Sequence, residues 1–160
     1  MDVAKGQELA NYVQQVASFR RSQVSLTQQA LLGSVWRLAF TTETNLPRDA
    51  MVYLNFQDEQ TMHYSLQFSK KTFGLNRLDA ISRWTLNNNN ISFVYDTIAM
   101  DAFGFKNVKI CFLGLFNGRT NYVETAFYDG DVWIESTLDN SGALLWNVFV
   151  REVDEDAWKK

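Results

Sequence analysis

The chain has 160 residues, the size of one domain, and its 46% hydrophobic and 21% charged residues exclude a wholly disordered chain. Its 15 basic and 18 acidic residues give a net charge of −3, without the positive excess that nucleic-acid binding needs. A single cysteine, Cys111, and a single histidine, His63, exclude an internal disulfide and a metal site built from several thiolates.

Two helices are predicted near the start of the chain. Apolar residues recur there at helical spacing: Leu9, Val13, Val16 and Phe19. This spacing predicts an amphipathic helix over residues 7–20. A second, short helix is expected over residues 26–32, with Ser25 or Thr27 as its N-cap and Gly33 at its end.

Beyond Gly33 the apolar residues alternate with polar ones, which is the period of a half-buried strand. The alternation predicts nine strands, over residues 35–42, 51–57, 61–69, 80–86, 91–96, 107–116, 119–127, 132–137 and 143–151. Asn117-Gly118 and Asp129-Gly130 are strong hairpin signals, and residues 139–142 form a four-residue loop. Most connections are therefore short enough to join neighbouring antiparallel strands.

A long antiparallel meander leaves two exposed edges unless it closes, so we predict an up-and-down β-barrel of eight or nine strands. Residues 1–33 are expected to form a helical segment packed on the barrel, residues 34–153 the barrel itself, and residues 154–160 a solvated tail. A barrel of this size can be filled by side chains or can hold one small ligand.

Segments at the two ends of the predicted sheet resemble one protein family. They are Leu32–Thr42, with the sequence LGSVWRLAFTT, then Val123–Ile134, VETAFYDGDVWI, and Trp146–Glu152, WNVFVRE. Together they resemble the plastid lipid-associated proteins, also called fibrillins or plastoglobulins. This chain has Gly-x-x-Trp where the family spacing is shorter, and it lacks the family's Pro-rich insertion, so it would be a compact, divergent member.

The resemblance implies a lipocalin-like barrel located in the chloroplast, at the thylakoid membrane periphery or in plastoglobules, after removal of a transit peptide. It also implies a non-enzymatic role in binding or carrying a prenylquinone, a carotenoid, a chlorophyll or a lipid, with no required cofactor and no metal. No catalytic residues come with it. Trp36 and Arg151 match positions that stack and close the base of lipocalin-type barrels, where a guanidinium over an indole contributes ~0.5–2 kcal/mol.

An apolar stripe on the predicted strands forms the candidate lining of a ligand cavity: Phe40, Met62, Tyr64, Leu66, Phe68, Phe93 and Tyr95. The same side chains could simply fill a small barrel. Trp84, Trp133 and Trp146 could equally be outer-face rings or ligand contacts.

Two other functions remain open. In the first, the barrel is filled and the protein is a small peripheral subunit docked on a photosynthetic pigment–protein complex, such as a photosystem or antenna. In the second, it is a barrel enzyme resembling a bilin lyase or a cyclase, but no nucleophile motif places Ser65 or Cys111 beside His63. The loop Phe103-Gly104-Phe105 could dip into a membrane surface, dock on a partner, or be a turn with buried rings.

Overall fold

The computed structural model describes residues 3–20, 26–44, 46–47, 49–72, 74–109, 120–139 and 141–159. Two α-helices precede the strands, and a short 3-10 helix, η2, follows them. The elements are α1 (Val3–Arg20), α2 (Gln28–Leu31), β1 (Val35–Thr41), β2 (Ala50–Phe56), β3 (Thr61–Thr72), β4 (Leu75–Asn87), β5 (Asn90–Ala102), β6 (Phe105–Lys109), β7 (Thr120–Tyr128), β8 (Val132–Leu138), β9 (Leu144–Arg151) and η2 (Ala157–Lys159).

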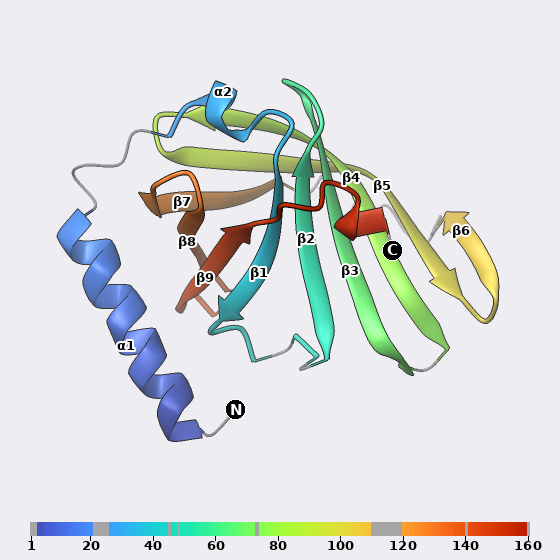
Figure 1. Ribbon diagram of the computed structural model, residues 1–160, viewed down its shortest axis with the longest axis horizontal. Helices are drawn as coiled ribbons and strands as arrows, with labels where there is room; N and C mark the ends of the chain where they lie inside the picture. Colours follow the sequence, from blue (N-terminus) through green and yellow to red (C-terminus); the bar gives the residue numbers. More distant parts are fainter. Residues whose placement is uncertain are drawn as a thin grey trace.

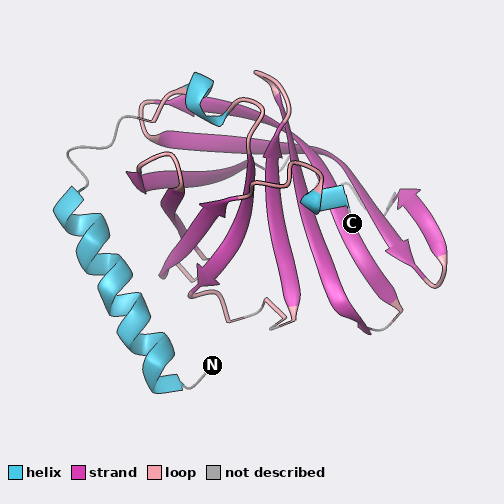
Figure 2. Ribbon diagram, viewed as in Figure 1, coloured by secondary structure: helices cyan, strands magenta, loops and turns pink. Residues whose placement is uncertain are grey.

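The sheet closes into an antiparallel barrel of eight strands, as the sequence predicted (Figure 1). The strands follow the order β4-β3-β2-β1-β9-β8-β7-β5, and pairing between β4 and β5 closes the ring. Closure leaves these strands without free edges, which an open meander of this length would expose. The barrel dominates the ribbon in Figure 2, with one main helix outside it.

The ninth strand, β6, lies outside this ring and pairs with β5. Of the expected strand over residues 107–116, residues 107–109 belong to β6 (Phe105–Lys109), which turns back on β5 through Phe103 and Gly104. Gly104 has a φ of +87°, a conformation that suits glycine. Residues 110–119, including Cys111 and the predicted Asn117-Gly118 turn, lie outside the described residues.

The strands β3, β4 and β5 are longer than predicted, with 12, 13 and 13 residues. Register shifts interrupt their alternation, one of them between Ile81 and Ser82 in the β4–β5 ladder. A β-bulge places two consecutive side chains on one face. The period of two therefore breaks within a continuous strand, which made these strands look shorter in the sequence.

Helix α2 covers one end of the barrel, here called the base (Figure 1). Thr27 is its N-cap, and the Thr27 Oγ1 accepts from Ala30 N at 3.2 Å, as one of the two predicted caps. Leu31 is buried within the barrel's core cluster. The Tyr128 hydroxyl donates to Ala30 O at 3.2 Å. These contacts hold the helix across the base.

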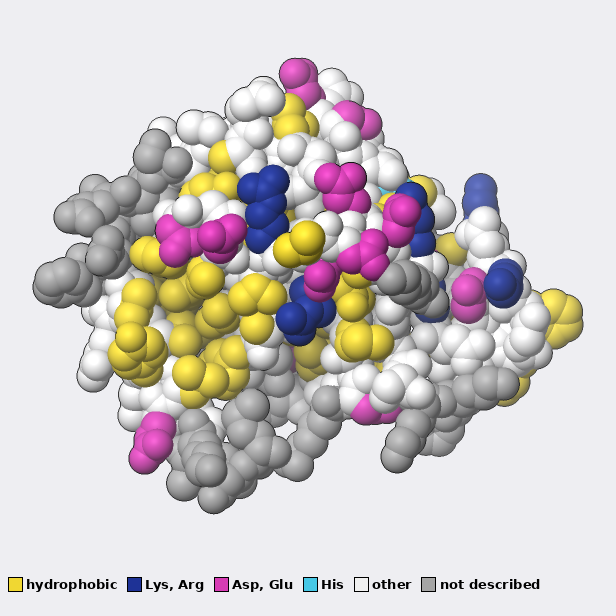
Figure 3. Space-filling model, viewed as in Figure 1, with side chains coloured by type: hydrophobic (Ala, Val, Ile, Leu, Met, Phe, Trp, Pro, Cys, Tyr) yellow, Lys and Arg dark blue, Asp and Glu magenta, His cyan; other side chains and the backbone are white. Residues whose placement is uncertain are grey.

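Helix α1 packs on the outside of the barrel rather than across an end (Figure 1). Val13 and Ala17 form an outer apolar cluster with Ala126 and Ile134, on β7 and β8. In Figure 3, hydrophobic side chains gather over α1 and the neighbouring strands β1 and β9. The partly buried members of this outer cluster are Val16, Phe40, Phe127, Val132, Trp146 and Val148.

The C-terminal residues fold back onto the outer face of β1, β2 and β3, so the prediction of a solvated tail over 154–160 was wrong for Trp158. This ring is buried in a cluster with Val35 and Tyr53. The Gln67 Nε2 donates to Trp158 O at 2.8 Å, which fixes η2 on β3. A tail rich in acids reads as solvated in sequence, but one large ring can bury enough apolar surface to anchor it.

None of the described helices is both long enough and apolar enough to cross a membrane.

Candidate functional site

Aromatic side chains fill the base of the barrel. The Trp133 ring lies 5.8 Å from that of Trp36, 5.9 Å from Phe56 and 5.3 Å from Phe149, between centroids. Phe56 in turn lies 4.8 Å from Trp84 in an edge-to-face arrangement. Trp84 and Trp133 are therefore interior rings, whereas Trp146 belongs to the outer cluster under α1.

The two predicted closure residues, Trp36 and Arg151, are register partners on β1 and β9. Trp36 is fully buried, and its Nε1 donates to Ser34 Oγ at 2.6 Å. Burial raises the pKa of Tyr128, and the charge of Arg151 opposes part of this rise. Tyr128 packs on Trp36 at 5.8 Å. Arg151 thus sits at the outer rim of the base, and its stacking on the indole remains a prediction.

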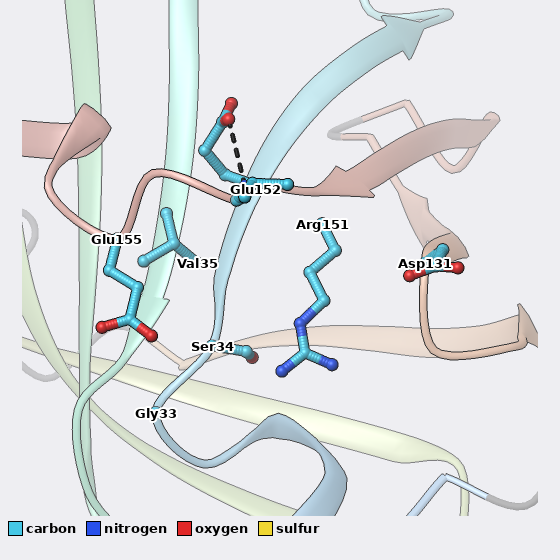
Figure 4. A pocket seen from close by; sticks show the side chains of 8 residues that line it. Gly33, Ser34, Val35, Asp131, Arg151, Glu152 and Glu155 are labelled. Carbon is cyan, nitrogen blue, oxygen red and sulfur yellow. Dashed lines mark hydrogen bonds between the residues drawn. The ribbon is translucent and has the colours of Figure 1, made fainter.

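A pocket of about 250 Å³ lies at this rim and includes Arg151. Figure 4 shows the Arg151 side chain pointing toward Gly33 and Ser34, with Asp131 and Glu155 on either side. Charged groups of both signs line the pocket, which is unlike the mostly apolar lining of sites for hydrophobic molecules. This pocket is therefore not the predicted apolar cavity.

Of the seven side chains predicted to line a cavity, two are buried in the core, four are partly buried inside the barrel, and one lies on the outside. Met62 and Phe93 are buried in the core cluster. Tyr64, Leu66, Phe68 and Tyr95 are only partly buried. Tyr64 and Leu66 pack against the core from the inside of the barrel, and Phe68 and Tyr95 share the inner faces of β3 and β5 by register. These four lie toward the end opposite α2, here called the mouth.

Phe40 was predicted to line the interior, and this was wrong. The register of β1 on β9 shifts between Leu38 and Phe40, and Phe40 pairs with Val148. Both residues belong to the outer cluster beneath α1. The irregularity turns Phe40 to the outer face. Strict alternation from Trp36 and Leu38 would instead have placed it on the inner face.

A polar cluster occupies the mouth side of the interior. Glu135 on β8 is opposite Asn147 on β9, and the Asn147 Nδ2 donates to Glu135 Oε1 at 3.0 Å. The Asn147 Oδ1 accepts from Thr41 Oγ1 at 2.6 Å. On the other side, Asn121 Nδ2 donates to Tyr95 OH at 3.1 Å. The interior therefore changes from aromatic at the base to polar at the mouth.

Glu135 is 4% exposed, and its Oε2 has no hydrogen-bond partner among the described residues. Burial raises the pKa of this carboxyl from 4.5 to about 7, while the Asn147 hydrogen bond opposes part of the rise. Burial also raises the pKa values of Tyr64 and Tyr95, and the charges of Glu43 and Glu135 add to both. The two tyrosine hydroxyls thus lie within electrostatic reach of Glu135.

Sequence reasoning missed Glu135, although a signal was present. Trp133 and Glu135 stand two apart in a predicted strand, so they share a face. This pattern puts Glu135 on the same face as a tryptophan, in a strand with few other charges. It indicates an inward carboxyl only if that face is known to line the interior. The closed barrel shows which face this is, because Trp133 belongs to the core cluster inside it.

His63 lies on the outer face of β3, where its ring is 5.2 Å from that of Trp158 and only partly exposed. Burial is the main cause that lowers its pKa. The Ser65 Oγ has no hydrogen-bond partner within the described part of the chain, so it is not activated by His63. In the same part of the chain, no group of three or more His, Cys, Asp or Glu could hold a metal ion.

No protein-family model matches the chain, and no curated protein matches it. Among solved structures, the chain is similar to bovine odorant binding protein in complex with a selenium-containing odorant. The two share 14% identity with a TM-score of 0.43, over 84% of this chain and 78% of that chain.

Proposed function

We propose that this protein binds one small hydrophobic molecule in the mouth-side half of its barrel, without catalysing a reaction. Here the mouth-side half means the inner-face residues Leu38, Tyr64, Leu66, Tyr95 and Glu135. One observation carries the proposal. Apart from Glu135, these inward side chains stay partly accessible, although the large rings at the base are fully buried: Trp36, Phe56, Trp84 and Trp133. An inward side chain that keeps accessible surface faces space that the chain does not fill.

The chemistry of this half suits such a ligand. Leu38, Leu66 and the ring faces of Tyr64 and Tyr95 supply apolar surface. The polar groups around Glu135 can fix orientation, as a small number of polar groups does in sites for small molecules. The base below them is closed by α2, so a ligand would enter from the mouth.

The finer identity of the ligand and its setting rest on the family resemblance alone. On that basis we propose a prenylquinone, carotenoid, chlorophyll or other lipid, and a place at the thylakoid surface or in plastoglobules of the chloroplast. Extraction of the protein from its native source, followed by mass spectrometry of bound hydrophobic compounds, tests this part of the proposal.

Binding itself is tested with the neutral fluorescent probe N-phenyl-1-naphthylamine. We expect saturable fluorescence enhancement on binding of the probe. Leu66→Trp should bind the probe at least tenfold more weakly, because it puts a bulky indole ring into the mouth-side half. Ile81→Trp is the matched control, because Ile81 is exposed and its register partner His63 lies on the outer face. Equal affinity of both variants and the unmodified protein, or no saturable binding, would refute the proposal.

One observation favours a second function, that of a peripheral subunit on a pigment–protein complex. The outer cluster between α1 and the strands leaves Phe40, Trp146 and Val148 partly exposed, and such a surface could meet a partner. Co-migration with a large membrane complex on a native gel, together with no probe binding, would favour this function over the first.

A further inference from the structure

The Glu135 carboxyl is an unusual group to find inside a small barrel. It is 4% exposed, and one of its oxygens, Oε2, has no partner among the described residues. A buried polar group without a hydrogen bond destabilises a fold by about 1–3 kcal/mol, and by more when it is charged. Native proteins rarely keep such a group unless it has another use. An apolar side chain of similar size, such as methionine, would avoid this penalty.

The neighbours of Glu135 hold it in one orientation. Asn147 donates to its Oε1 at 3.0 Å, and Thr41 in turn donates to the Asn147 Oδ1 at 2.6 Å. This chain of hydrogen bonds occupies Oε1 and leaves Oε2 as the free acceptor. The carboxyl is therefore fixed by packing and hydrogen bonding, which is how polar groups in binding sites are kept in position.

A hydroxyl without a hydrogen-bond partner among the described residues faces the same interior as this carboxyl. Tyr64 is on the inner face of β3, and its hydroxyl makes no hydrogen bond to any described residue. The pKa of Tyr64 is raised, chiefly by burial and to a smaller extent by charges that include Glu135. The mouth-side half thus presents one unused acceptor and one unused donor to the same interior.

We propose that the molecule held in the barrel presents a hydroxyl group that donates to Glu135 Oε2 and accepts from the Tyr64 hydroxyl. This inference rests on the proposed function and narrows it to hydrophobic alcohols or phenols. A hydroxyl is both donor and acceptor, so it satisfies both groups at once. An ether or ketone offers no donor to Glu135, and a carboxylate places a second negative charge beside it.

Four probes built on a twelve-carbon chain separate these cases by displacement of N-phenyl-1-naphthylamine at pH 8. They are 1-dodecanol, 1-methoxydodecane, 2-dodecanone and dodecanoate. We expect 1-dodecanol to bind at least tenfold more tightly than each of the others. In Glu135→Gln the preference for 1-dodecanol over 1-methoxydodecane should fall below about threefold. The reason is that the glutamine amide can donate to the ether oxygen as well as accept from the alcohol.

Two further variants keep the test decisive. Tyr64→Phe should weaken 1-dodecanol severalfold, and it keeps the ring that packs on the core. Glu59→Gln, on the exposed turn before β3, removes one negative charge elsewhere and should leave the preference unchanged. Far-UV circular dichroism checks that each variant is folded.

The outcomes distinguish the two proposals. If N-phenyl-1-naphthylamine itself does not bind, the proposed function fails. If it binds but all four probes displace it equally, or Glu135→Gln leaves the preference for 1-dodecanol intact, then the hydroxyl inference is overturned while the binding function stands. Tight dodecanoate binding would overturn it in the same way.

Discussion

Replacing Glu135 by glutamine should make the protein more stable at neutral and alkaline pH, and the gain should depend on pH. In the folded chain burial raises the pKa of Glu135 from 4.5 to about 7. Between these values the folded state holds a proton that the unfolded state has lost, so the stability of the unmodified protein falls as pH rises through this range. At about 1.4 kcal/mol per pH unit, the ionised carboxyl destabilises the fold by about 3 kcal/mol above pH 7.

The measurement is urea-induced unfolding at several pH values from 4.5 to 9, followed by tryptophan fluorescence, with no ligand present. The quantity to plot is the difference in unfolding free energy between Glu135→Gln and the unmodified protein. We expect this difference to grow in favour of the variant from pH 4.5 to 7 and to level off by pH 8. Contributions from other titrating groups are common to both proteins and cancel. A difference that does not change with pH would refute the assigned burial of the charge.

Three other substitutions test the packing around the barrel. Ser34→Ala removes the hydroxyl that accepts the hydrogen bond from the buried Trp36 indole N–H. It should lower the free energy of unfolding in urea by about 1–3 kcal/mol. A loss below about 0.5 kcal/mol would contradict the role of this hydrogen bond. Trp158→Ala exposes the His63 ring to solvent, so the pKa of this imidazole should rise toward 6.5 in a proton NMR titration. An unchanged titration would show that Trp158 does not bury His63. Gly74→Ala should lower the melting temperature, because Gly74 has a φ of +78° and an added methyl group would collide with the facing Phe103 ring. An unaltered melting temperature would contradict this strain.

The sequence was sufficient for the architecture because the hydrophobic period is a local property of the chain. The change from helical spacing before Gly33 to alternation after it predicted helices followed by strands. The Asp129-Gly130 turn joins β7 to β8 as its residues indicate, and the bounds of β9 differ from the predicted strand by one residue. Closure followed because a meander of this many strands would otherwise leave two exposed edges.

Tertiary structure alone decided which side chains face inward and which of them meet. One register shift turned Phe40 outward, and pairing with β5 took β6 out of the ring. The fold brought Thr41, Glu135 and Asn147 into one hydrogen-bonded cluster although Thr41 is far from the others in sequence. Local patterns describe a strand's two faces but not which face is enclosed, since that depends on partners from distant parts of the chain.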